Sequence, residues 1–80
     1  MKVVFYGRLA DVIGPEIDVR APDGCSVSEL RDRLAAEHPD AEHTLRSKRA
    51  RACIGDALVP DDHLLVDADT VEFLPPVSGG

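Results

Sequence analysis

The pattern of apolar and polar residues in three segments predicts β-strands. Lys2–Tyr6 has apolar or aromatic residues on both faces, which predicts a central strand. Glu16–Arg20 alternates strictly between polar and apolar residues, as in a strand with one solvated face. Thr70–Leu74 places Val71 and Phe73 on one face and predicts the final strand.

The clearest helix begins near Ser26, where Ser26 and Glu29 form an S-x-x-E capping box. Their side chains can satisfy free backbone donors in the first helical turn. The apolar residues that share one face of this helix are Val27, Leu30 and Leu34. The charged residues at positions 29 and 31–33 are expected to point mostly to water. His38-Pro39 ends the helix, because the residue before a proline disfavours helical geometry.

Shorter patterns fill the rest of the chain. Arg8–Ile13 has helical spacing and is stopped by the glycine and proline that follow it. Asp40–Arg46 predicts one or two further helical turns. Ala50–Ile54 and Ala57–Val59 predict two short strands joined by a type II′ turn, because a glycine comes first in the two-residue loop. The apolar residues 64–66 lie between two polar turns and are expected to pack inward.

This order of elements predicts an α+β fold of the β-grasp kind. One main helix should cover one face of a mixed sheet, and the last strand should lie beside the first. We expect the β-grasp domain to span residues 1–75 and a flexible carboxy-terminal tail to span residues 76–80.

Composition restricts the classes of function. The chain has 80 residues, which allows one domain and leaves little room for a deep enzyme cleft. Its 15 acidic and 9 basic residues give a formal charge of −6, which argues against non-specific binding to nucleic acid. The charge fits docking onto a basic partner, although it would also simply keep a small domain in solution. No segment has the length of a signal peptide or a membrane span, so a cytoplasmic protein is expected.

The segment Leu74–Gly80 has the composition of a terminus that is inserted into another protein. Pro75 and Pro76 cannot donate backbone hydrogen bonds, so they end the last strand and stiffen its exit. Residues 76–80 could reach ~17 Å if extended. Gly79 and Gly80 lack Cβ atoms and suit a narrow slot. The alternative is a disordered terminus that happens to be rich in glycine.

A free terminal carboxylate is ionised at neutral pH and is a poor electrophile. To accept sulfur, it must first become an acyl adenylate. The chain has no Walker-type loop or other nucleotide motif, so a partner protein that uses ATP must supply this chemistry. The product would be a terminal thiocarboxylate, a nucleophile able to donate sulfur in a second active site.

The whole chain resembles the small-subunit family of molybdopterin synthase, which belongs to the ubiquitin-like β-grasp sulfur carriers. The resemblance rests on the opening strand Val3–Tyr6, the short helix Leu9–Gly14, the capped helix Ser26–Leu34 and the strand Asp69–Phe73. Its most specific part is the ending Phe73–Gly80, with two prolines before the paired glycines.

The resemblance implies that an E1-like adenylyltransferase activates Gly80 with ATP and Mg²⁺, and that a sulfurtransferase provides the sulfur. Gly79 would help the tail to thread into the large synthase subunit. Sulfur would then pass to cyclic pyranopterin monophosphate, within a heterotetramer of two large and two small subunits. The small subunit would be part of a sulfurtransferase enzyme but would not be catalytic alone, and it would bind no cofactor itself.

Apolar residues near the tail are candidates for the surface that docks on the large subunit, although they could equally be core. They are Phe5, Leu58, Phe73 and Val77. A basic cluster in the acidic chain could meet an acidic patch of a partner or be a solvated loop. It consists of Arg46, Lys48, Arg49 and Arg51.

Other chemistry-bearing residues are expected to be structural. Cys25 precedes a helix N-terminus, a position that can lower the pKa of a thiol. Neither Cys25 nor Cys53 has a base or a second cysteine nearby in sequence, so sulfur handling by either thiol is not expected. The three histidines lack a metal-binding spacing, so no metal site is expected. They are His38, His43 and His63.

Two other functions begin with the same acyl adenylate. The chain could be a ubiquitin-like modifier, joined through Gly80 to lysine amines of other proteins. It could also donate sulfur to another pathway, such as thiamine synthesis or tRNA thiolation.

Overall fold

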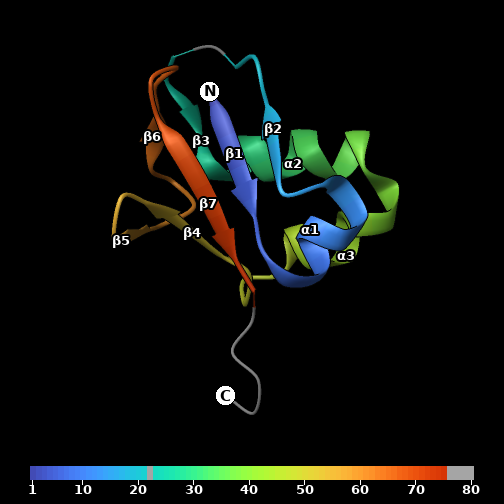
Figure 1. Cartoon of the computed structure of the whole chain (residues 1–80). Helices are drawn as coiled ribbons and strands as arrows, with labels where there is room; N and C mark the ends of the chain where they lie inside the picture. Colours follow the sequence, from blue (N-terminus) through green and yellow to red (C-terminus); the bar gives the residue numbers. More distant parts are fainter. Residues whose placement is uncertain (22, 76–80) are drawn as a thin grey trace.

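The computed structural model describes residues 1–21 and 23–75. Figure 1 shows its elements. The strands are β1 (Lys2–Phe5), β2 (Glu16–Asp18), β3 (Cys25–Ser26), β4 (Arg51–Ile54), β5 (Ala57–Val59), β6 (Leu64–Leu65) and β7 (Thr70–Leu74). The helices are α1 (Gly7–Ile13), α2 (Val27–Glu37), the 3₁₀ turn η1 (Pro39–Ala41) and α3 (Glu42–Arg46). The predicted tail, residues 76–80, lies outside the described residues.

Five strands form one mixed sheet in the order β2-β1-β7-β4-β5. β7 lies at its centre, parallel to β1 and antiparallel to β4. Helix α2 crosses one face of this sheet (Figure 1). β3 and β6 pair separately as a short two-stranded sheet. The predicted α+β arrangement is confirmed, including a first strand paired with the last.

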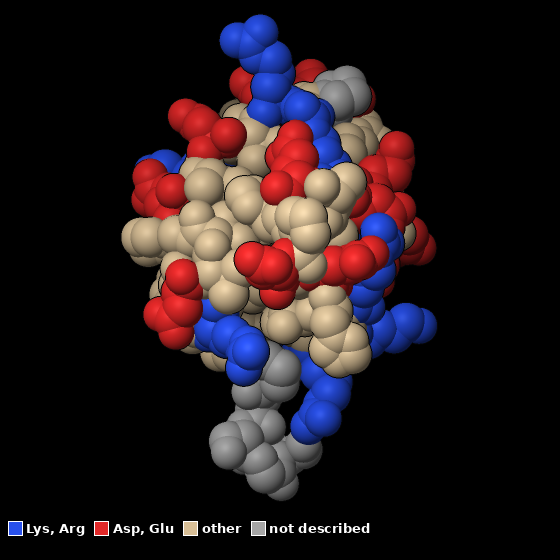
Figure 2. Space-filling view, turned by 90° about the vertical axis from the view of Figure 1, so that its right-hand side faces the viewer, with Lys and Arg blue, Asp and Glu red and all other residues tan. Residues whose placement is uncertain are grey.

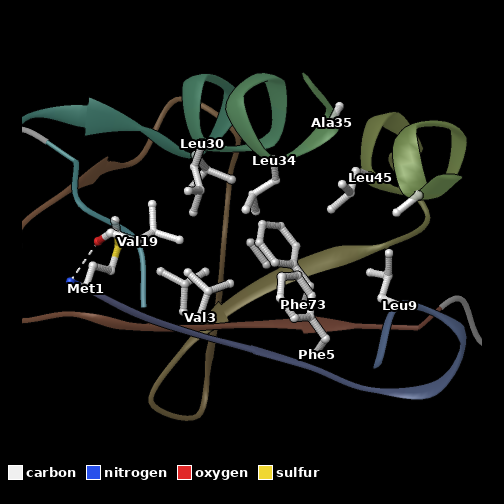
Figure 3. Close-up of a cluster of buried hydrophobic side chains, with 14 of the residues drawn as sticks. Met1, Val3, Phe5, Leu9, Val19, Leu30, Leu34, Ala35, Leu45 and Phe73 are labelled. Carbon is white, nitrogen blue, oxygen red and sulfur yellow. Dashed lines mark hydrogen bonds between the residues drawn. The ribbon is translucent and has the colours of Figure 1, made fainter. Parts of the chain in front are cut away.

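The core lies between the sheet and the helices (Figure 3). Phe5 of β1 and Phe73 of β7 stack at its centre, with ring centroids 5.9 Å apart. Leu30 and Leu34 of α2 point down toward them and are fully buried. The two phenylalanines are 2% and 0% exposed, so their assignment to a docking surface is wrong. The register directs both rings toward α2, where they bury large apolar areas.

Local sequence signals explain where α2 begins and ends. The Ser26 Oγ accepts a hydrogen bond from the Glu29 N–H at 3.0 Å, and the Glu29 carboxylate accepts one from the Ser26 N–H at 3.1 Å. The predicted capping box is therefore formed. The helix ends at Glu37, and His38 is its C-cap before Pro39, as predicted.

The backbone of the β4–β5 turn agrees with the turn type that its sequence predicts. Gly55 has φ +63°, whereas Asp56 has no positive φ. That combination fits the predicted type II′ turn, which needs a left-handed residue only at its first central position.

The segment 64–66 does not pack inward as predicted. Leu65 is buried, but Leu64 is 63% exposed and Val66 is 48% exposed. Leu64 and Leu65 form strand β6, in which successive side chains point to opposite sides. Only one side of this strand faces the core.

The prediction that residue 31 points to water is wrong, because Arg31 is only 6% exposed. Its guanidinium donates hydrogen bonds to the carbonyls of Leu45 at 2.7 Å, Ser47 at 3.2 Å and Ala50 at 2.5 Å. It also pairs with Asp61 at 3.1 Å. Its central carbon lies 5.2 Å from the centroid of the Phe73 ring. These partners compensate for the removal of the charge from water.

Candidate functional site

The described structure fixes the position from which the predicted tail begins. Leu74 ends β7, and the exposed Pro75 follows it. Because β1 runs parallel to β7, the chain that leaves β1 turns into α1 at the same end of the sheet. Gly7 makes this turn with φ +58°, and a Cβ atom there would lie 3.4 Å from the Pro75 Cβ. Gly7 thus allows both a left-handed turn and a close approach to Pro75.

The predicted reactive residues are not part of what the structure describes. Gly79 and Gly80 lie outside the described residues, as does Val77 of the predicted docking surface. Their roles therefore rest on the sequence alone.

The face of the sheet turned away from α2 is here called the outer face. The register places Val4, Arg51, Cys53, Leu58, Glu72 and Leu74 on it. Leu58 lies opposite Cys53 and is 52% exposed. Of the docking residues predicted within the described part of the chain, Leu58 is the one that lies at the surface. The outer face continues at Leu74 into the exit of the tail.

Tyr6 and Glu72 interact on this same face. The Tyr6 hydroxyl donates a hydrogen bond to the Glu72 carboxylate. This bond raises the pKa of Tyr6, and desolvation and the negative charge of Glu72 act in the same direction. Sequence patterns did not indicate the pair, because its partners lie 66 positions apart. Only the pairing of β1 with β7 brings them together.

We predict that Tyr6 titrates above its ordinary value of about 10. Tyr6 is the only tyrosine and the chain has no tryptophan, so tyrosinate absorbance follows this one group. The Glu72→Ala variant should titrate at lower pH than the wild type, because it loses both the hydrogen bond and the charge. Because the pKa of Tyr6 is higher in the folded than in the unfolded protein, the interaction stabilises the fold fully at pH values below the unfolded pKa. This stabilisation is lost as pH rises through the folded pKa. Identical titration midpoints for the two proteins would contradict the assignment.

The two cysteines are free thiols and lie in different strands, Cys25 in β3 and Cys53 in β4. Burial raises the pKa of Cys25, and the nearby Glu29 carboxylate raises it further. This direction is opposite to the one that a helix N-terminus alone would give. The Cys53 Sγ donates to the Gly55 carbonyl at 3.2 Å. The environment of Cys25 therefore does not favour a reactive thiolate.

The three histidines lie in different parts of the fold, and one residue of the predicted basic cluster is paired away from the others. His38 caps α2, His43 lies in α3 and His63 precedes β6. Within residues 1–21 and 23–75, no three histidine, cysteine or acidic side chains are grouped as metal ligands. Arg46 is bound to Asp32 and Glu42, which separates it from the rest of the basic cluster. In the same part of the chain, no helix has the length and apolarity needed to cross a membrane.

The model of the ThiS family matches residues 3–80 of the chain. The chain belongs to the ThiS family. Among ThiS-like relatives, the molybdopterin synthase sulfur carrier subunit of Escherichia coli K12 is 34% identical over all of this chain and 99% of that protein. The corresponding subunit of Haemophilus influenzae is 24% identical over the same shares. The resemblance drawn from the sequence is confirmed.

Solved structures confirm the ubiquitin-like β-grasp fold of this ThiS-family chain. Small archaeal modifier protein 1 of Haloferax volcanii superposes with a TM-score of 0.83 at 21% identity, over 99% of this chain and 97% of that one. One chain of the complex of subunits 1 and 2 of the molybdopterin-converting factor of Helicobacter pylori superposes with a TM-score of 0.65 at 25% identity. The match covers 99% of this chain and 96% of that one.

Proposed function

We propose that this protein is the sulfur carrier subunit of molybdopterin synthase. The full-length match to the Escherichia coli carrier subunit is the observation that carries this proposal. The terminal carboxylate of Gly80 is its reacting group. Sulfur from its thiocarboxylate passes to cyclic pyranopterin monophosphate during synthesis of the molybdenum cofactor.

Loading requires two steps on the Gly80 carboxylate. One carboxylate oxygen attacks the α-phosphorus of ATP, and pyrophosphate leaves. Hydrosulfide then attacks the carbonyl carbon of the acyl adenylate, AMP leaves, and loss of the proton gives the thiocarboxylate. We assign the first step to an E1-like adenylyltransferase that uses Mg²⁺ and the supply of sulfur to a sulfurtransferase, with the pathway in the cytoplasm. Gly79 gives the segment the small cross-section that a narrow slot requires.

The large synthase subunit is the proposed partner for sulfur transfer. The two subunits of the Helicobacter pylori factor form a protein–protein complex, which supports this partner. On the carrier, Leu58 offers an exposed apolar contact on the outer face, and Pro75 follows Leu74 at the end of that face. We propose an assembly of two large and two small subunits, in which the large subunit supplies the substrate pocket. The carrier is then the sulfur-donating part of a sulfurtransferase and is not catalytic alone.

Intact mass spectrometry tests the proposed loading. The carrier is incubated with the activating enzyme, ATP, Mg²⁺ and a sulfur source, and a parallel sample lacks ATP. We expect a mass gain equal to the difference between one sulfur and one oxygen atom, confined to the fragment that contains Gly80. No gain in the complete mixture would refute the carrier role. Isopeptide adducts on many proteins, without a complex with the large subunit, would instead support a protein modifier.

A further inference from the structure

The end of the molecule from which the tail begins is basic, although the whole chain has a formal charge of −6. In Figure 2, lysine and arginine side chains gather at the lower end, toward which β7 points in Figure 1. Several exposed cations lie on the elements that meet there, and Arg49 is one of them. Arg8 is in the first turn of α1, Lys48 is in the α3–β4 loop, and Arg51 begins β4 opposite Leu74. We call Arg8, Lys48 and Arg51 the basic collar.

The collar residues differ from several other cations of the domain in their ion pairing. Lys2, Arg33 and Arg46 are exposed, and each forms an ion pair with a carboxylate of its own chain. None of the collar residues forms an ion pair within the described part of the chain. Their charges are therefore available to an external anionic group.

Arg31 fixes the backbone that presents two of these cations. Its hydrogen bonds to the Leu45, Ser47 and Ala50 carbonyls hold the loop on both sides of Lys48. A depression of about 360 Å³ lies beside this loop. It is lined by Arg31, Lys48, Arg51, Val59, Pro60 and Asp61. Lys48 and Arg51 of the collar therefore lie at a concave surface whose backbone Arg31 holds in place.

We propose that the basic collar docks against a carboxylate-rich rim around the slot of the large synthase subunit that takes the tail. This inference rests on the proposed function. Residues 76–80 follow Pro75 at this end of the sheet, so the protein that receives them also faces the collar. Cations without partners on their own chain favour aspartate and glutamate side chains across an interface. Such pairs accelerate the encounter and orient the carrier before the tail enters.

The test measures binding of the full-length carrier to the large subunit from the same organism. The Lys48→Glu/Arg51→Glu variant reverses two collar charges. The matched control, Lys2→Glu/Arg20→Glu, changes the net charge equally at the opposite end, where β1 begins and Val19 pairs with Met1.

At low ionic strength we expect the collar variant to associate about tenfold more slowly, with little change in dissociation. The difference should shrink at about 0.15 M salt. The control should stay within about twofold of the wild type.

Each alternative outcome overturns the proposal in a different way. Equal slowing of both variants would show that total charge, and not the collar, controls association. Wild-type association rates for the collar variant would show that the collar does not contact the large subunit. If the collar variant associates more slowly with the activating enzyme but normally with the large subunit, the collar is assigned to the activating enzyme instead. Failure of the wild-type carrier itself to bind the large subunit would overturn the proposed function as well. Circular dichroism and melting temperatures establish that both variants are folded.

Discussion

Deletion of Gly80 is expected to abolish thiocarboxylate formation while the domain remains folded. The deletion moves the terminal carboxylate back by one residue, about 3.4 Å of extended chain. A displacement of about 1 Å can already cost a reaction ~100-fold, because the reacting atoms must meet in the correct geometry. We therefore expect the rate of loading to fall by more than ~100-fold. The rate is followed by intact mass and by release of pyrophosphate.

Ser78→Ala is the matched control for this deletion, because it retains the chain length and both glycines. It should load at a rate close to that of the wild type. The melting temperature of the deletion variant should also be unchanged, since the core cluster of the described residues ends at Phe73. Normal loading of the shortened chain would refute the assignment of the reaction to Gly80. Loss of folding would show that the terminus contributes to the domain.

Replacement of Arg31 by methionine is expected to lower the free energy of unfolding by about 3–5 kcal/mol. Methionine retains much of the apolar length of the side chain but has no hydrogen-bond donor. The carbonyls of Leu45 and Ala50 would lose their buried guanidinium partner, and Asp61 would lose its ion pair. A buried acceptor left without a partner costs about 1–3 kcal/mol. Urea denaturation measures the change through a lower midpoint at an unchanged slope.

Two further variants control for the loss of charge. Arg33→Met lies on the same helix, but Arg33 is exposed and pairs with Glu37, so its loss should cost less than about 1 kcal/mol. Arg31→Lys keeps the charge without the planar set of donors and should fall between the wild type and Arg31→Met. Equal stabilities of Arg31→Met and Arg33→Met would contradict the structural role of the guanidinium. If Arg31→Met does not fold, the lysine variant still provides the comparison.

Arg31 also shows how far helical periodicity predicts burial. Residues 27, 30, 31 and 34 follow the i, i+3, i+4, i+7 pattern of a buried stripe, so the position of Arg31 on the core side was already present in the sequence. Its charge indicated the opposite, because an isolated cation is rarely buried. The prediction was wrong because the acceptors that surround Arg31 come from residues 14 to 30 positions further along the chain.

The phenylalanines and Leu58 illustrate the same limit for the docking surface. Alternation shows that Phe73 shares a face with Val71, but it does not show which face of the sheet α2 covers. That depends on the strand order, which places Phe5 and Phe73 side by side under α2 and leaves Leu58 on the outer face. Apolar composition alone therefore did not separate core residues from surface residues.

By itself, the sequence determined most of the secondary elements, the capped start of α2, the β-grasp class and the family, because these depend on periods, caps and motifs among neighbouring residues. It did not indicate the short strands β3 and β6. The tail composition also predicts that Gly80 is the reacting terminus. Only the tertiary structure decided that Arg31 is buried and that Tyr6 contacts Glu72. It likewise brought Arg8, Lys48 and Arg51 to one end of the sheet. The physical reason is that these contacts depend on strand order and register, which join residues far apart in the chain.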